Sequence, residues 1–219
     1  MIIDVLTLFP SMFDNFLNTS IIKRAIDKEK VVINIIDFRK YSNNKHNKVD
    51  DVSFGGGAGM ILKCEPIFNA LDDIKKEDSF VILTTPKGKV YKQEIAKELS
   101  QKKHLIIICG HYEGYDERIR STVDCEISVG DYILTGGEIP SLIIMDSVIR
   151  LLDDVISKSS LESESFNDNL LDYPVYTKPR IYRKMEVPEV LLSGDHKKID
   201  EYRAKESIRI TKERRSDLL

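Results

Sequence analysis

The sequence predicts an α/β protein, a parallel sheet flanked by helices, followed by a small, mostly helical C-terminal domain. Segments 80–85 (FVILTT) and 104–109 (HLIIIC) are continuously apolar and are separated by a helical pattern. Such strands are typical of a parallel sheet that is covered on both faces. A polar, serine-rich stretch, 157–172, separates this body from a basic C-terminal segment. The 219 residues suffice for one large domain or two small ones.

The first part of the chain predicts two strands with a helical region between them. Segments 1–8 and 31–37 are short and rich in β-branched residues, so we expect both to be strands. From Pro10 onward, apolar residues recur at helical spacing as far as Ile26. Residues 38–59 are polar and glycine-rich and have no period, which predicts a long loop that is either functional or disordered.

The pattern then alternates between helix and strand. Apolar spacing predicts helices across 67–74, 91–99 and 142–152, and residues 125–129 form a fifth strand candidate. We expect residues 130–140, between that strand and the last helix, to be a loop.

The basic C-terminal segment predicts one long helix. Its prolines, the last at Pro188, exclude a long helix before about Ser193, and residues 196–215 then form a basic amphipathic pattern. Residues 178–219 contain 12 Lys and Arg against 8 Asp and Glu, whereas the preceding residues contain 21 against 28. A basic arm of this kind often binds phosphate, although a solvated basic helix is at least as common.

Composition excludes several classes of protein. No apolar run approaches the roughly 18 residues that span a bilayer, and the N-terminus does not resemble a signal peptide, so we expect a cytoplasmic protein with no membrane segment. Cys64, Cys109 and Cys125 form no CxxC pair, and the four histidines lack metal-ligand spacing. We therefore expect neither a disulfide framework nor a metal site.

Three glycine-containing loops follow apolar strands, at 85–88, 110–114 and 130–138. In an open α/β sheet, ligands bind beyond the carboxyl ends of the strands. Glycine lets the backbone approach a ligand, and exposed N–H and C=O groups are able to recognise adenine. One glycine alone is explained by a tight turn, but three such loops favour a shared pocket. The common P-loop, GxGxxG and GxSxG motifs are absent.

Six motifs, in order, give the chain a recognisable resemblance. They are LFPSMF (8–13), DDVSFGGGAGM (50–60), CGHYEGYDER (109–118), VGDYILTGGEIP (129–140), LLDYPVYTKP (170–179) and VPEVLLSGDH (187–196). Together they resemble the bacterial tRNA (guanine-N1)-methyltransferase (TrmD) family, and the match covers nearly the whole chain.

The resemblance implies an S-adenosylmethionine-dependent enzyme that methylates N1 of guanosine at tRNA position 37, next to the anticodon. It also implies a homodimer of the α/β-knot (SPOUT) class, with a C-terminal trefoil knot in the catalytic domain. On this basis residues 1–156 are the catalytic domain, 157–172 an interdomain linker that carries the base, and 173–219 a basic helical tRNA-binding domain.

Guanine N1 carries a proton at neutral pH, so the chemistry calls for a base and for a cation near the developing charge. The resemblance assigns the base to Glu164, where the family commonly has aspartate, and the assisting cation to Arg150. Asp172 and Asp168 are alternative carboxylates. Asp172 is equally explained as a turn or helix cap, and Glu164 as one charge in a solvated linker.

The resemblance also implies a pocket for the methyl donor. Glu113 could balance the positive charge of the donor, or it could pair with Arg118 instead. The implied pocket residues are Pro86, Gly110, Tyr112, Glu113, Gly114, Val129, Gly130, Asp131, Tyr132, Ile133, Leu134, Gly136, Gly137 and Pro140.

The basic arm supplies candidate contacts to tRNA phosphates, which position a substrate without reading its bases. These residues are Lys178, Arg180, Arg183, Lys184, Arg203, Lys205, Arg209, Arg214 and Arg215. We expect a homodimer in which the arm of one subunit covers the pocket of the other, so that the active site lies at the subunit interface. A requirement for Mg²⁺ is compatible with the sequence but is not indicated by it.

Two other functions remain open at this point. A related knotted methyltransferase that modifies another RNA position, such as a ribose 2′-hydroxyl, would not need a base for N1. A catalytically silent RNA-binding homologue would keep the fold and lose the donor pocket, but the intact 110–114 and 129–134 segments argue against it.

Overall fold

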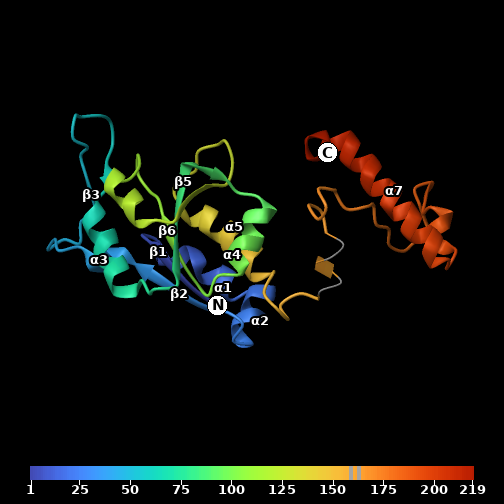
Figure 1. Ribbon diagram of the computed structural model, residues 1–219, viewed down its shortest axis with the longest axis horizontal. Helices are drawn as coiled ribbons and strands as arrows, with labels where there is room; N and C mark the ends of the chain where they lie inside the picture. The colour runs from blue at the N-terminus through green and yellow to red at the C-terminus, as the bar shows by residue number, and fades with distance from the viewer. Residues whose placement is uncertain (158–159, 162–163) are drawn as a thin grey trace. The chain divides into compact units, whose positions relative to one another are not determined.

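The computed structural model describes residues 1–157, 160–161 and 164–219 and divides the chain into two compact units (Figure 1). The first unit is Met1–Ile156 and the second is Ser157–Leu219. None of the described helices is long and apolar enough to cross a membrane.

A five-stranded parallel sheet forms the centre of the first unit, in the order β2-β1-β6-β5-β7. Its strands are β1 (Ile2–Thr7), β2 (Val32–Asp37), β5 (Ser79–Val90), β6 (His104–Cys109) and β7 (Cys125–Ser128). The predicted fold class, a parallel sheet flanked by helices, is confirmed.

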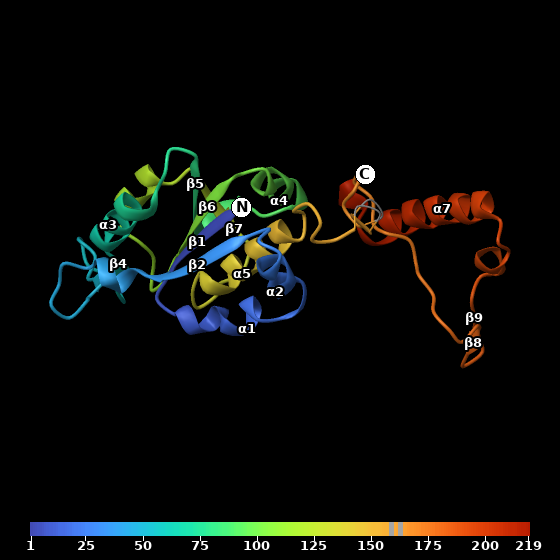
Figure 2. The ribbon, with the colours of Figure 1, turned by 90° about the horizontal axis from the view of Figure 1, so that it is seen from below.

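Both faces of this sheet are covered because its central strands are apolar on both sides. In β6, Leu105 and Ile107 belong to one core cluster, and Ile106 belongs to the other. Four helices contribute side chains to the first cluster, and one helix and one 3₁₀ helix contribute to the second, together with Phe38 and Val49. In both ribbon views these two sets of helices lie on opposite sides of the sheet (Figures 1 and 2). The first set is α1 (Asp14–Leu17), α2 (Ser20–Asp27), α4 (Gln93–Ser100) and α5 (Glu138–Ile149), and the second is α3 (Cys64–Ile74) with the 3₁₀ helix η3 (Glu117–Thr122).

Several element boundaries differ from the sequence predictions. The helical region after Pro10 is broken into η1 (Pro10–Phe13), α1 and α2, and Ser20 has a left-handed φ of 52° where α2 begins. Residues 85–88 are not a simple loop, because β5 continues to Val90 with an irregularity between Thr84 and Lys89. The last helix of the body, α5, begins at Glu138 inside the predicted loop and ends at Ile149.

The long segment 38–59 contains local structure at its start and again at residues 50–51, so the prediction of one continuous loop was wrong at these two places. A 3₁₀ helix, η2 (Phe38–Tyr41), follows β2, and β3 (Asp50–Asp51) pairs in antiparallel fashion with β4 (Ile61–Leu62). Phe38 and Val49 are buried in the second core cluster, and this burial holds both parts of the segment against the sheet. These elements are only two to four residues long, so they produce no helix or strand periodicity in the sequence.

The second unit is built around α7 (His196–Arg214), which matches the predicted C-terminal helix. The carboxylate of Asp195 accepts a hydrogen bond from the amide of Lys198 at 3.2 Å and so caps the helix. The unit also contains two 3₁₀ helices, η4 (Glu189–Leu192) and η5 (Ser216–Leu218), and a hairpin of β8 (Ile181–Tyr182) and β9 (Met185–Glu186) that sequence patterning missed.

Residues 164–172 belong to the second unit and pack on α7, although they were predicted to be part of a linker. The amide of Leu171 donates to the hydroxyl of Thr211 at 2.8 Å, and the hydroxyl of Ser207 donates to the carbonyl of Leu171. Residues 158–159 and 162–163 of the predicted linker lie outside the described residues.

Candidate functional site

A cavity of about 430 Å³ lies at the carboxyl ends of β5, β6 and β7. That volume is within the usual range for small-molecule sites. The cavity is lined by Thr84, Thr85, Pro86, Lys87, Gly110, His111, Tyr112, Glu113, Gly114, Tyr115, Ile127, Ser128, Val129, Gly130, Tyr132, Ile133, Leu134, Thr135, Gly136, Gly137 and Pro140.

The structure brings together around this cavity all the predicted donor-pocket residues except Asp131, which is exposed and does not line it. Several lining residues were not among the named candidates, although Thr85, Lys87 and His111 lie within the loops that were predicted to share a pocket. Thr84 and Thr85 end a buried strand, which is a recognisable signal for a site in a parallel sheet. The pocket loops containing Lys87 and His111 were predicted, but Tyr115 lies one residue beyond the predicted 110–114 loop.

Hydrogen bonds join the three loops into one frame. The amide of Gly137 donates to the carbonyl of Gly110 at 2.7 Å, and the amide of Gly110 donates to the hydroxyl of Thr84 at 3.2 Å. A Cβ at Gly137 would lie 2.1 Å from Thr84 Oγ1 and 2.6 Å from the amide nitrogen of Gly110. Glycine is therefore required at 137 by close approach between loops.

The glycine-rich motif at 50–60 stands beside the same cavity. The amide of Glu113 donates to the carbonyl of Met60 at 3.0 Å, and the amide of Leu62 donates to the carbonyl of Gly114 at 2.9 Å. Gly59 has a φ of 79°, and a Cβ there would lie 2.4 Å from Glu113 Cγ. This segment therefore fixes the loop that carries Glu113.

Two buried titratable side chains lie where the pocket loops join the sheet and helix: Cys109 at the end of β6 and Glu138 at the start of α5. Glu138, at the first turn of α5, is 2% exposed, and its carboxylate accepts a hydrogen bond from the hydroxyl of Thr7 at 2.8 Å. The negative charge is also favoured by the N-terminus of the helix. Burial, with Glu138 nearby, raises the pKa of the Cys109 thiol well above its usual value, so this cysteine stays protonated. It is not a nucleophile.

Tyr115 keeps its proton over the ordinary pH range. Burial, then its hydrogen bond to Glu126, raises the pKa of Tyr115 to about 12. The Lys87 ammonium lies 5.9 Å from the centre of the same ring. Within the lining, Glu113 is the one carboxylate and Lys87 the one permanent cation, so the cavity presents one charge of each sign.

The predicted catalytic residues do not line this cavity. Arg150 caps the end of α5 opposite Glu138, and a twelve-residue helix is about 18 Å long. Glu164 and Asp172 belong to the second unit. The Asp172 carboxylate accepts a hydrogen bond from the amide of Tyr173 at 2.7 Å, so it holds a local turn. Asp168 is exposed and has a φ of 51°.

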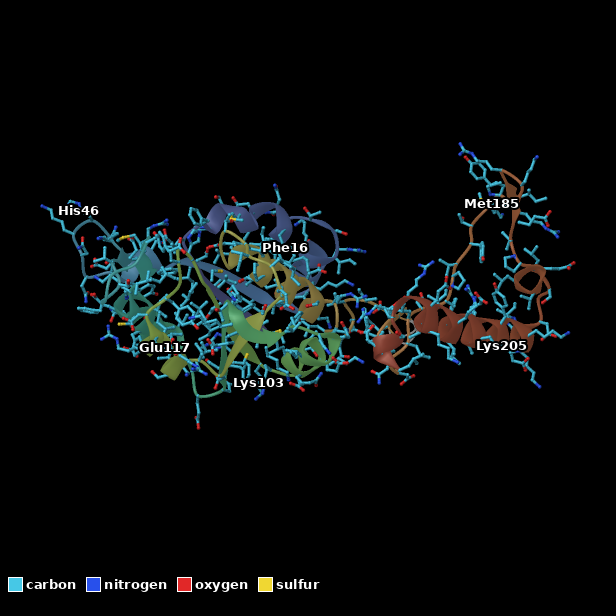
Figure 3. All side chains as sticks on the ribbon, turned by 90° about the horizontal axis from the view of Figure 1, so that it is seen from above. Phe16, His46, Lys103, Glu117, Met185 and Lys205 are labelled. Atoms are coloured by element: carbon cyan, nitrogen blue, oxygen red, sulfur yellow. The ribbon has the colours of Figure 1, made fainter. Side chains whose placement is uncertain are left out.

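The basic residues predicted to bind tRNA differ in their surroundings. In α7, Arg209 pairs with Glu206 at 2.7 Å and with Glu213 at 2.8 Å. Arg215 pairs with Asp217, and Arg203 lies 3.7 Å from Asp200. Figure 3 shows Lys205 on α7 and Met185 on the β8–β9 hairpin, both of them exposed.

Among the described residues, no group of three or more His, Cys, Asp and Glu side chains is arranged to hold a metal ion.

Fold and cavity together define an α/β protein with a small-molecule site, built by glycine loops at the carboxyl ends of parallel strands. The model of the family described as tRNA (Guanine-1)-methyltransferase TrmD matches residues 1–219. The chain therefore belongs to this family.

Several relatives carry the name tRNA (guanine-N(1)-)-methyltransferase. The relative from Ureaplasma urealyticum is 57% identical over 217 residues, which is 99% of this chain and 95% of the relative. The Malacoplasma penetrans protein is 57% identical over 216 residues, with coverage of 99% and 96%. The Staphylococcus epidermidis protein is 56% identical over 220 residues, with coverage of 99% and 90%.

Proposed function

We propose that the protein transfers a methyl group from S-adenosylmethionine to N1 of guanosine at tRNA position 37. The observation that carries the proposal is the cavity at the carboxyl ends of β5, β6 and β7, built from the family's glycine-containing motifs. S-adenosylmethionine supplies an activated methyl group, so the protein chiefly has to orient two substrates and remove a proton.

The lining fits this donor. Ile127, Leu134 and Pro140 offer apolar surface for a flat nucleoside, and backbone groups at the glycines offer hydrogen bonds. Glu113 is suited to balance the donor's positive charge, and Lys87 is suited to a carboxylate. The tight packing at Gly137 holds these loops in place before the donor binds.

Removal of the N1 proton falls to a carboxylate. We assign Glu164 as the general base, with Asp172 as the alternative, and Arg150 as the cation that stabilises charge developing toward O6. The Asp172 carboxylate accepts a hydrogen bond from the amide of Tyr173, which gives it a role in a local turn.

Two observations support a homodimer with the active site at the subunit interface. Arg150 lies a helix length away from the end of α5 that lines the cavity, so it is far from the cavity of its own subunit. In addition, α5 and the loop before it expose apolar side chains, since Ile139 and Ile143 are 43% and 40% exposed and Ile133 is 81% exposed. Apolar surface of this kind is typical of a protein interface.

The remaining parts of the proposal concern organisation. Residues 1–156 form the catalytic domain with the trefoil knot, 157–172 carry the base, and 173–219 bind tRNA through their basic residues. Phosphate contacts there position the substrate, and the target guanine is read as an unpaired base in the cavity.

The test is transfer of a labelled methyl group from S-adenosylmethionine to a tRNA with guanosine at position 37, compared with a matched tRNA that has adenosine there. We expect incorporation into the first tRNA alone. Equal incorporation into both would point to another RNA position, and tRNA binding without incorporation would point to a silent homologue.

A further inference from the structure

The β8–β9 hairpin has an unusual turn. Tyr182 pairs with Met185, so Arg183 and Lys184 are the two central residues of a two-residue loop. Their φ angles are 49° and 67°, both in the left-handed region. A two-residue turn with positive φ at both centres is of type I′, for which Asn-Gly is the favoured sequence. Here both positions carry long cationic side chains instead.

This turn is conformationally costly, because L-residues with a Cβ rarely adopt positive φ. Strain of this kind persists where the surrounding structure or a function requires it. The surrounding structure does not require it here, since residues 175–186 are all exposed. The side chains of Arg183 and Lys184 therefore have a use that outweighs a better turn.

The charges on the hairpin arm, residues 178–186, are available to a partner. The arm contains Lys178, Arg180, Arg183 and Lys184 against one acidic residue, Glu186. Within the described part of the chain, none of these four basic side chains lies in an ion pair. In contrast, Arg209 of α7 pairs with Glu206 and Glu213, and Arg215, directly after α7, pairs with Asp217.

Aromatic and apolar surface accompanies these charges. Tyr182 is 57% exposed, and the Arg183 guanidinium lies 5.3 Å from the centre of its ring. Ile181 and Met185 are 54% and 65% exposed. Cations beside an exposed aromatic face are the combination that binds a phosphate and stacks on an unpaired base of RNA.

We propose that the β8–β9 hairpin is a tRNA-docking element, in which Arg183 and Lys184 contact backbone phosphates and Tyr182 stacks on an unpaired base. The inference rests on the proposed function, in that it takes the RNA to be tRNA. It goes further in ranking this hairpin above α7 as the source of affinity, and in explaining why the turn keeps two strained cations.

The decisive variant is the double substitution Arg183→Asn/Lys184→Gly, which installs the favoured turn and removes both charges. Its turn is better, so we expect amide exchange at Val187, whose N–H donates to the carbonyl of Arg180 at 3.0 Å, to be no faster than in the wild type. We expect the Kd for tRNA to rise about tenfold, and the slope of log K against log salt to fall by about 2.

A charge-matched control lies in the same unit. The double substitution Lys197→Asn/Lys198→Asn also removes two exposed positive charges, but from α7. We expect a smaller loss of affinity than for the hairpin variant. Tyr182→Ala should weaken binding without changing the salt slope, and Tyr182→Phe should restore it because stacking needs only the ring.

Direct tRNA binding is measured separately from methyl transfer, so a failure of the proposed reaction does not decide the docking inference. The inference is overturned if the hairpin variant binds tRNA as the wild type does, or if the α7 control loses as much affinity. It is also overturned if the hairpin variant changes the oligomeric state, since that result would assign the hairpin to a contact between two copies of the chain.

Discussion

The amide of Gly137 donates a 2.7 Å hydrogen bond to the carbonyl of Gly110, and this bond joins the loop before α5 to the loop after β6. The two residues are 27 positions apart in sequence, yet both line the same cavity. The shape of the cavity therefore depends on a contact that has no space for a side chain.

Gly137→Ala should abolish donor binding and destabilise the first unit. Its Cβ would lie 2.1 Å from Thr84 Oγ1 and 2.7 Å from Cys109 Cα, so the two loops must separate. We expect a loss of about 1 to 3 kcal/mol in the free energy of unfolding. Calorimetry with S-adenosylmethionine and chemical denaturation measure the two effects.

Adding Thr84→Ala to this variant removes the closest contact but leaves the two backbone contacts, so we expect no rescue. Gly194→Asn provides a control, because a Cβ there meets nothing within 4 Å and asparagine tolerates its φ of 72°. Unchanged donor binding by Gly137→Ala would show that the loop junction does not shape the site.

Glu164→Gln should lower kcat by about 100-fold or more, because the amide cannot accept the N1 proton. Glu164→Asp keeps the carboxylate and should retain most of the activity. Binding of S-adenosylmethionine should be unchanged in both, since Glu164 does not line the cavity. If Glu164→Gln stays fully active while Asp172→Asn loses kcat, the general base is Asp172.

The proposed dimer predicts complementation between two inactive variants. In mixed dimers of Gly137→Ala and Glu164→Gln subunits, one cavity keeps Gly137 and receives an intact Glu164, provided that Glu164 acts on the cavity of the partner subunit. After subunit exchange at equal concentrations, activity should reach about a quarter of the wild-type value, since about half of the dimers are mixed. If Glu164 acts on the cavity of its own subunit, the mixture stays as inactive as each variant alone.

The parallel sheet could be predicted from sequence because its signal is local. Residues 105–109 are apolar at every position, and both side-chain faces of β6 are buried. The continuation of β5 past Thr84 had no such signal, because it depends on β7. A Cβ at Gly88 would lie 2.4 Å from the amide nitrogen of Ile127, a contact between residues far apart in sequence.

The glycines of the cavity were predictable in the same way, since three strand ends carry them. The loops that contain Lys87 and His111 were predicted as well, but which of their side chains line the cavity was not, because that depends on how three loops pack together. The β8–β9 hairpin was missed because its turn residues are not ones that sequence patterning associates with a turn. Arg183–Lys184 is not a sequence that favours a turn, although both residues have positive φ in the structure.

The most direct test of the account is nucleoside analysis of tRNA after reaction with the protein and S-adenosylmethionine. Digestion to nucleosides identifies the modified base, and mass spectrometry of ribonuclease fragments identifies its position. The account predicts 1-methylguanosine at position 37, and its absence from tRNA that has adenosine there. A methylated ribose or a methyl group at another position would contradict it.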